Sequence, residues 1–338
     1  MPDKGGPDPR PEGTAVARPL ALSDNDQRMM RIKETTSMSI TSFMFHDIRN
    51  NDDIRFRNRY TLKPFLTVAE FTTQLDFIVS NYKIISTSEL FSVTDNNQYA
   101  ILTFDDGLID HYHIQPLLKD YKIRGTFLVP AGILLHNVVM KSHKIQFVLS
   151  AADEKQLVRE ILGHVRDHDA IWERFSHSRF TDNWWTPEMV FVTNFLRNYE
   201  DHETTSFIVD RLFDKYVSTD HGSFARRFYL NHGQIAEMIK NGMEIGGHGY
   251  YSNDLTALSH EDQQTDIAST FEYIKSLRQD CDLFFSYPNG GFDHNTIALM
   301  KQNHCKVAYT TESTSVDRLE DVDLLRFPRI SAPETLRR

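Results

Sequence analysis

The sequence has little of what marks several common classes of protein. Its 338 residues include only two cysteines, Cys281 and Cys305, whose spacing fits neither a disulfide framework nor a cysteine metal site. We expect both to be free thiols in a reducing compartment. No concentrated basic patch stands out against the formal net charge of -10, which argues against nucleic-acid binding.

Long apolar runs are also missing. No segment has the length of a membrane-spanning helix, and the first residues, rich in Pro, Gly and Asp, contain no apolar signal core. We therefore expect residues 1–32 to be a disordered tail and the protein to be cytoplasmic. The chain length suits one large α/β domain or two ordinary ones, and the hydrophobic content of 40% can build a sizeable core.

The stretch from residue 99 to residue 112 is the most informative. An apolar run at 100–104 predicts a buried strand, and Asp105, Asp106 and Gly107 follow it directly. Glycine permits a sharp exit from a strand. Adjacent carboxylates repel each other, so at least one needs a cation or a proton nearby. An ordinary surface Asp-Asp-Gly turn is the alternative interpretation.

Strand and helix patterns alternate on both sides of this stretch, which predicts a parallel sheet with right-handed crossovers. Residues 132–228 break the alternation, because strand signals are few there and amphipathic runs predict a helical insertion. We expect the insertion's tryptophans to pack into its own small core, although a wall that stacks against sugar rings is the alternative. These residues are Trp172, Trp184 and Trp185.

Four predicted strands end in residues that can do chemistry. The strand ends carry His46, the pair Asp105 and Asp106, His248, and the turn from Tyr287 to Asn289. A (β/α) barrel brings the carboxyl ends of its strands to one rim, where active sites lie. Any one histidine can be an ordinary core residue, but four such strand ends together indicate a site.

An aspartate and a histidine on this rim can hold a divalent transition metal such as Zn²⁺, with water in the open position. The metal polarises an acyl oxygen and activates the water, and the other carboxylate takes the proton as general base. A second histidine across the rim can protonate the leaving amine, and a backbone N–H of the turn after Tyr287 can meet the oxyanion. This chemistry is the hydrolysis of an amide or an ester.

The motifs resemble those of the polysaccharide deacetylase family, carbohydrate esterase family four. Residues 103–107, TFDDG, match the family's first motif in full. The resemblance implies that Asp105 is the general base and Asp106 a metal ligand. Residues 246–259 are similar to the second motif and place His248 on the first of its two metal histidines.

The third motif and both ends of the chain extend the resemblance. Residues 286–290, SYPNG, are similar to the third motif, which implies that the backbone N–H at Asn289 contributes to the oxyanion site. Residues 43–48 resemble the N-terminal strand of circularly permuted members, which implies that His46 is the general acid. Residues 325–330 resemble the ending of the same members, and the helical insertion resembles one in deacetylase-like proteins of O-antigen and capsule gene clusters.

The resemblance implies a fold and a function. The fold is a distorted, incomplete (β/α)7 barrel over residues 33–338 with the helical insertion at about 132–228. The function is that of a metal-dependent N-deacylase with zinc as the expected metal and no organic cofactor. Its substrate is expected to be an N-acylated amino sugar, nucleotide- or lipid-linked, in surface-polysaccharide biosynthesis, and its acyl group acetyl or formyl.

The chain departs from the family pattern in its second and third motifs, and it has no clear equivalent of the fourth, acidic motif. Ser252 stands where the second metal histidine is expected, and serine is a poor zinc ligand. Either water completes the site or another residue substitutes; His143 and Asn253 are candidates, although we favour His143 as an ordinary helix-start residue. Ser286 replaces the arginine that steadies the base, and Arg329 can restore that charge unless it is an exposed surface residue.

Two other functions stay open. Ser252 favours a weakened or inactive homologue that binds a sugar or a partner enzyme without turnover. A less favoured alternative is an amidohydrolase-type metal enzyme with His111 and His113 as its ligand pair. Such a pair should close a strand, whereas these residues follow Gly107 at a predicted helix start.

Overall fold

The computed structural model describes residues 38–49, 65–177 and 185–332. The predicted tail, residues 1–32, lies outside the described residues, and so does Trp184. All of the described residues belong to one compact unit, Thr36–Arg337.

The main sheet is parallel, as the alternating pattern predicts. Its strands are β1 (Ser39–Phe45), β4 (Lys83–Ile84), β5 (Gln98–Asp105), β6 (Thr126–Val129), β7 (Glu244–Gly247), β8 (Leu283–Ser286), β9 (Cys305–Tyr309) and β10 (Ile330–Ser331). Their order is β10-β1-β5-β6-β7-β8-β9, with β4 paired to β5. A separate parallel pair joins β2 (Asp47–Arg49) and β3 (Phe65–Thr67).

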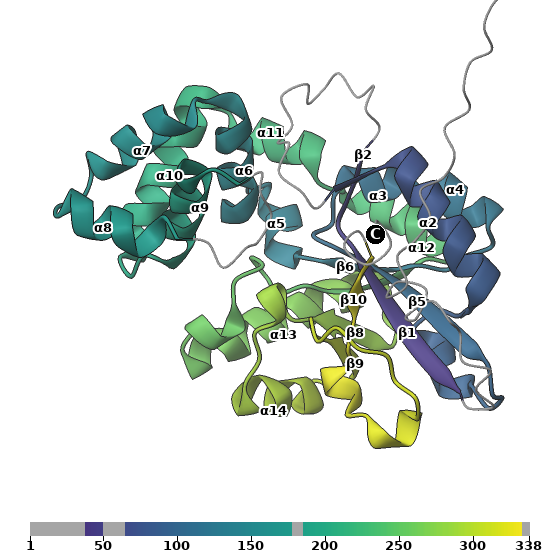
Figure 1. Cartoon of the computed structure of the whole chain (residues 1–338). Helices are drawn as coiled ribbons and strands as arrows, with labels where there is room; N and C mark the ends of the chain where they lie inside the picture. Colours follow the sequence, from purple (N-terminus) through teal and green to yellow (C-terminus); the bar gives the residue numbers. More distant parts are fainter. Residues whose placement is uncertain (1–37, 50–64, 178–184, 333–338) are drawn as a thin grey trace, which may run out of the picture. The chain divides into compact units, whose positions relative to one another are not determined.

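The sheet curls into an incomplete barrel, which confirms the predicted fold class (Figure 1). The last segment contacts both of its edges. Tyr309 of β9 forms a parallel bridge with Phe327, and Ile330 of β10 pairs with Phe43 of β1. Arg329 therefore lies between the two edges, where its side chain is buried.

The apolar pattern of residues 324–330 predicts a last continuous strand, and this prediction is wrong. Leu324–Arg326 forms a 3₁₀ turn, whose N–H at Leu325 is capped by the Asp323 side chain, and only β10 is extended. Pro328 explains part of the break, because proline has no N–H to donate to a strand ladder.

Alternation along β5 sorts its side chains between two cores. Ala100, Leu102 and Phe104 pack into the hydrophobic cluster between the sheet and its helices. Tyr99 and Ile101 join a second cluster with side chains of β6, β8 and β9 inside the barrel. Since side chains alternate along a strand, Asp105 belongs to the inner face.

Outside the helical insertion, the described residues contain six α-helices. They are α2 (Val68–Asn81), α3 (Ile109–His113), α4 (Gln115–Asp120), α12 (His232–Lys240), α13 (His260–Leu277) and α14 (His294–Gln302). A threonine followed by a glutamate three residues later predicts a helix start at Thr67, and Thr67 and Glu70 do form a capping box at the start of α2. Pro116 lies in the first turn of α4, and its missing N–H accounts for a break in what the sequence suggests is one helix.

The predicted insertion is helical. Its helices are α5 (Ala131–His136), α6 (Lys141–Ala151), α7 (Glu154–Leu162), α8 (His168–Phe175), α9 (Pro187–Asn198), α10 (His202–Tyr216) and α11 (His221–Phe228). They share a hydrophobic cluster of their own. Trp172 stacks on Phe191 at 5.1 Å between ring centroids, and Trp185 also packs against the cluster. Both tryptophans thus pack into the insertion's own core.

Two expectations from composition can be compared directly with the structure. Cys281 and Cys305 are free thiols. Among the helices in the described residues, none combines the length and the apolar character needed to cross a bilayer.

Candidate active site

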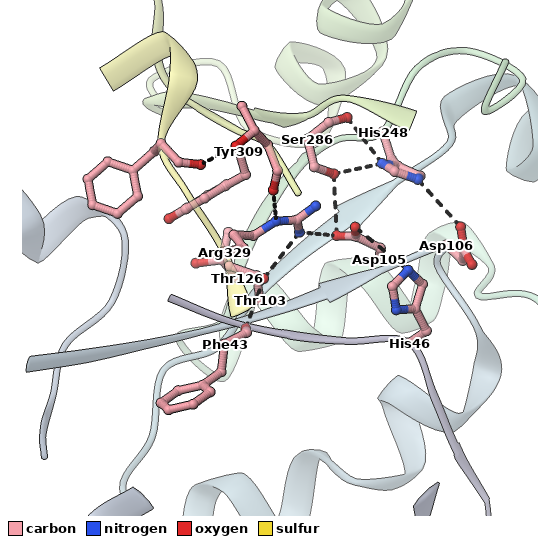
Figure 2. A network of polar contacts seen from close by, with 12 residues as sticks. Phe43, His46, Thr103, Asp105, Asp106, Thr126, His248, Ser286, Tyr309 and Arg329 are labelled. Carbon is pink, nitrogen blue, oxygen red and sulfur yellow. Dashed lines mark hydrogen bonds and ion pairs between the residues drawn. The ribbon is translucent and has the colours of Figure 1, made fainter. Parts of the chain in front are cut away.

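Four side chains from three strand ends gather at the carboxyl edge of the sheet (Figure 2). His46 follows β1, Asp105 closes β5, Asp106 comes next, and His248 follows β7. Parallel strands direct their carboxyl ends to the same edge, so the strand register itself brings these residues together.

Asp105 is almost fully buried, with 1% of its surface exposed. Its Oδ1 accepts a hydrogen bond from Nη1 of Arg329 at 2.8 Å and one from the Ser286 hydroxyl at 3.3 Å. The Arg329 side chain is completely buried. Arg329 therefore supplies the charge that the third motif lacks, and it is not an exposed surface residue.

Asp106 takes an unusual backbone conformation, with φ at +77°. Such a φ is uncommon outside glycine, although aspartate tolerates it better than most residues. The next residue, Gly107, also has a positive φ, of +62°. This sharp turn lets two successive carboxylates face different partners: Asp105 contacts Arg329, and Asp106 lies beside histidines.

His248 presents one ring nitrogen to Asp106 and the other to β8. Its Nε2 lies 3.5 Å from Oδ1 of Asp106. Its Nδ1 lies 3.1 Å from the Ser286 carbonyl and 2.6 Å from the Ser286 hydroxyl. A carbonyl only accepts, so the bond to it favours the proton on Nδ1 and leaves Nε2 with a free lone pair.

His46 completes the cluster from the end of β1, the strand that pairs with β5. Its Nε2 is 4.0 Å from Oδ2 of Asp105, and its side chain is 35% exposed, so a substrate can reach it. The backbone carbonyl of His46 accepts a hydrogen bond from Nε2 of His111 at 2.7 Å. Burial lowers the pKa of His111 to about 4, so this ring is neutral and serves to hold the strand end.

The alternative ligand pair is not supported. His111 is buried and bonded to His46, whereas His113 is exposed, and both lie on α3 rather than at the end of a strand. The contact between His111 and His46 could not be predicted from the sequence, because the two residues are far apart in the chain.

His143 lies closer to the site than its sequence position suggests. It is the third residue of α6 and is buried. Its Nε2 lies 3.6 Å from Oδ2 of Asp106, and its Nδ1 is 2.7 Å from the Tyr229 hydroxyl. His143 does lie at the start of a helix, as predicted. Its contact with Asp106 and its hydrogen bond with Tyr229 were not predicted from the sequence.

The remaining predicted positions are less closely tied to the cluster. Asn289 lies in the 3₁₀ turn Pro288–Gly290 directly after β8, with φ at +55°, and is exposed. Ser252 and Asn253 lie in the segment after His248. Within the described part of the chain, no hydrogen bond or ion pair joins these three residues to Asp105 or Asp106.

Burial and nearby cations shift the pKa of the two carboxyl groups in opposite directions. Burial would raise the pKa of both groups. At Asp105 the effect of burial is exceeded by that of the Arg329 guanidinium, together with His248 and His46, so the pKa of Asp105 falls below its ordinary value. At Asp106 the main opposing group is His143, and the pKa falls well below the usual range. Both groups are therefore carboxylates at neutral pH.

The donor set suits a divalent transition metal. Carboxylate oxygen and imidazole nitrogen are typical zinc ligands, and His248 has its second nitrogen engaged, as metal-binding histidines usually do. In the three described ranges, however, no group of three or more His, Cys, Asp and Glu side chains stands ready to hold an ion. Asp106 and His248 thus present two donors of the types that such a metal binds, without a complete preformed site.

Sequence comparison relates the chain to known deacetylases. A family model described as "Polysaccharide deacetylase" matches residues 180–308, a range that contains His248 and Asn289. The chain is 23% identical over 109 residues to the Bacillus subtilis protein "Putative polysaccharide deacetylase YxkH". That alignment spans 32% of this chain and 39% of the relative, so it covers well under half of each protein.

Similar folds occur among solved structures. The deacetylase PplD of Streptococcus pyogenes, solved with acetate, is 17% identical with a TM-score of 0.55, over 89% of this chain and 97% of that one. IcaB from Ammonifex degensii is 15% identical with a TM-score of 0.52, over 88% and 92%. At these identities the likeness establishes the fold.

Proposed function

We propose that the chain is a member of the polysaccharide deacetylase family and a metal-dependent N-deacylase acting on an N-acylated amino sugar; the match of that family's model to residues 180–308 and the similarity to a curated deacetylase relative support the family. The observation that carries the proposal is the cluster of Asp105, Asp106, His46 and His248 at one edge of the sheet. It combines two ionised carboxylates, one buried imidazole and one accessible imidazole.

Asp106 and His248 are the proposed metal ligands, and zinc is the proposed metal. The Asp106 carboxylate faces the Nε2 of His248 at 3.5 Å, and the Ser286 carbonyl fixes the ring's orientation. When bound, a divalent ion polarises an acyl oxygen and lowers the pKa of water. The protein's part is to present these two donors, already charged or correctly protonated, at the edge of the sheet.

Asp105 is the proposed general base. Its low pKa keeps it ionised, but a weakly basic carboxylate needs an acidified water as its partner. Arg329 and Ser286 hold its Oδ1, which leaves Oδ2 on the side of His46. The buried ion pair thus fixes the direction in which Asp105 accepts a proton.

His46 is the proposed general acid. It lies across the cluster from His248 and is accessible to a substrate, so it can give a proton to the leaving amine. The backbone N–H of Asn289, in the turn after β8, is proposed to donate to the developing oxyanion.

The proposed substrate follows from the sequence resemblance. It is a nucleotide- or lipid-linked amino sugar whose acyl group is acetyl or formyl. A place in surface-polysaccharide synthesis and in the cytoplasm stays a prediction from the sequence.

The proposal is tested by acyl release. Zinc-loaded protein is incubated with nucleotide-linked N-acetyl and N-formyl amino sugars, and acetate, formate and free amine are measured. We expect one acyl acid and one amine per turnover. Asp105→Asn should lower the rate about 100- to 10,000-fold, because it removes the general base. Asp120→Asn, at an exposed carboxylate on α4, is the control and should keep the rate.

The same assay separates the alternative function. If sugars bind to the zinc-loaded protein and no acyl acid is released from any of them, the protein is a binding homologue and the enzyme proposal fails. Equal rates for the wild type and Asp105→Asn would contradict the assigned base.

A further inference from the structure

The metal site of the proposed function lacks one histidine in the family's usual position, and the helical insertion brings another to Asp106. We propose that His143 is the third protein ligand of the divalent metal, alongside Asp106 and His248. The inference rests on the proposed function and assigns a ligand that compensates for Ser252.

The distances suit donors that share one ion. In a tetrahedral zinc site with bonds of about 2.0 to 2.1 Å, neighbouring ligand atoms are about 3.3 Å apart. The Nε2 atoms of His143 and His248 lie 3.6 and 3.5 Å from the Asp106 oxygens. They face different oxygens of that carboxylate. Within the described residues no group of three such side chains is arranged to hold an ion, so the inference requires that Asp106 or one of the rings turn when the metal binds.

Both histidines are held in the same way. The Nδ1 of His248 is engaged by Ser286, and the Nδ1 of His143 by the Tyr229 hydroxyl. In each case Nε2 is the atom that faces Asp106. Metal-binding histidines typically have their second nitrogen engaged by such a partner, which fixes the ring.

The fold positions His143 through the chain segment that leaves the insertion. Tyr229 pairs with Leu108 in an antiparallel bridge, and the N–H of Leu230 donates to the carbonyl of Gly107 at 2.9 Å. This segment is therefore bonded to the turn that carries Asp106. The Tyr229 hydroxyl then holds the His143 ring, and Phe228 packs edge-on against it at 5.1 Å.

Burial strengthens the assignment. His143 is 3% exposed and His248 5%, so few waters can solvate Asp106 from these two sides. An ion placed there exchanges water for protein donors on two faces. The remaining open position is then available to water or to an acyl oxygen, as in zinc enzymes with three protein ligands.

Metal binding is the test, because it reports on His143 without relying on turnover. Zinc affinity is measured by competition with a chromophoric chelator. We expect His143→Ala to weaken binding by more than about 100-fold, and Tyr229→Phe, which removes only the orienting hydroxyl, by about 10- to 100-fold. His221→Ala is the matched control, since His221 also lies in the insertion beside an aspartate, Asp214, and should bind zinc as the wild type does.

A measurement on the unaltered chain guards against misfolded variants. X-ray absorption at the zinc edge counts the imidazoles on the metal, and we expect two. One imidazole, no bound zinc, or wild-type affinity in His143→Ala would overturn the inference. Two imidazoles on the metal without acyl release would support His143 as a ligand and reject the proposed function. Acyl release with only one imidazole on the metal would support the proposed function and reject His143 as a ligand.

Discussion

At the scale of single residues, the buried ion pair of Asp105 and Arg329 connects stability with chemistry. Arg329 Nη1 also lies 3.2 Å from the Thr103 hydroxyl, and its Nε donates to the Thr310 carbonyl at 3.1 Å. A guanidinium held by several partners keeps its position, so the Asp105 carboxylate faces a fixed charge. Removing either member leaves an uncompensated charge in the protein interior.

We predict that Arg329→Met lowers the free energy of unfolding by about 3 to 5 kcal/mol at neutral pH, because it leaves Asp105 charged and buried. Denaturant titration measures the loss. Without the guanidinium, burial raises the pKa of Asp105, so the acidic limb of the pH–rate profile should move to higher pH.

The stability that the Asp105–Arg329 pair contributes should depend on pH. The pKa of Asp105 is lower in the folded wild type than its ordinary value of 3.8. The pair therefore stabilises the fold above that pH, and this stabilisation is lost as the pH falls through the folded pKa. The difference between wild type and Arg329→Met should shrink in acid. Arg326→Met, at an exposed arginine of the same segment, should show no such difference.

The positions of residues that directly follow a strand could be predicted from the sequence. Asp105, Asp106 and His248 stand next to short apolar runs, and a strand end is readable from such a run. His143 gave no comparable signal, because its contact with Asp106 depends on how the insertion packs. Burial of Arg329 likewise depends on the last segment reaching both edges of the sheet.

At the scale of elements, a buried carboxyl of α13 holds the segment that follows β7. Oδ1 of Asp266 accepts the N–H of Tyr250 at 2.8 Å, two residues after His248. Burial raises the pKa of Asp266 to about 6. The helix thus supports the segment that follows His248 through a carboxyl that is costly to ionise.

We predict that Asp266→Asn flattens the dependence of stability on pH. The pKa of Asp266 is higher in the folded protein than its ordinary value of 3.8. The folded state therefore binds more protons, and this group's contribution is lost as the pH rises through the window from 3.8 to about 6. The amide of the variant can still accept the Tyr250 N–H. Its melting temperature should therefore fall less than that of the wild type between about pH 4 and about pH 6, the ends of that window.

A steeper fall in the Asp266→Asn variant than in the wild type would contradict this account of α13. Asp262→Asn, at an exposed carboxylate on the same helix, is the matched control for the general effect of removing a charge from α13.

Most elements were readable from the sequence, and the errors have local causes. The capping box at Thr67 marked the start of α2 correctly. The run from 109 to 121 was expected to be one helix, but Pro116 separates α3 from α4. The expected strand at 324–330 failed because a capped 3₁₀ turn satisfies its backbone groups instead.

At the scale of the whole molecule, the insertion is joined to the barrel at the site itself. It has its own hydrophobic cluster, which the sequence pattern predicted. The pattern did not predict that the Tyr229 segment pairs with the turn carrying Asp106, since bonds between distant segments leave no periodic signal. An ion bound by Asp106, His248 and His143 would then tie β5, β7 and α6 together.

We predict that zinc stabilises the protein against heat. A ligand that binds only the folded state at 100 times its dissociation constant adds about 2.7 kcal/mol, which for a domain of this size corresponds to about 5 °C. Differential scanning calorimetry with and without zinc measures the shift. Asp106→Asn should abolish it, and a wild-type melting temperature that does not respond to zinc would contradict the prediction.

Zinc, in the proposed site, lies between Asp106 and His248 at the carboxyl edge of the sheet. Anomalous diffraction from a zinc-soaked crystal, recorded on both sides of the zinc edge, tests this position most directly. We predict one strong peak within bonding distance of the Asp106 carboxylate and the His248 imidazole. A peak bound elsewhere, with none beside Asp106, would contradict the account.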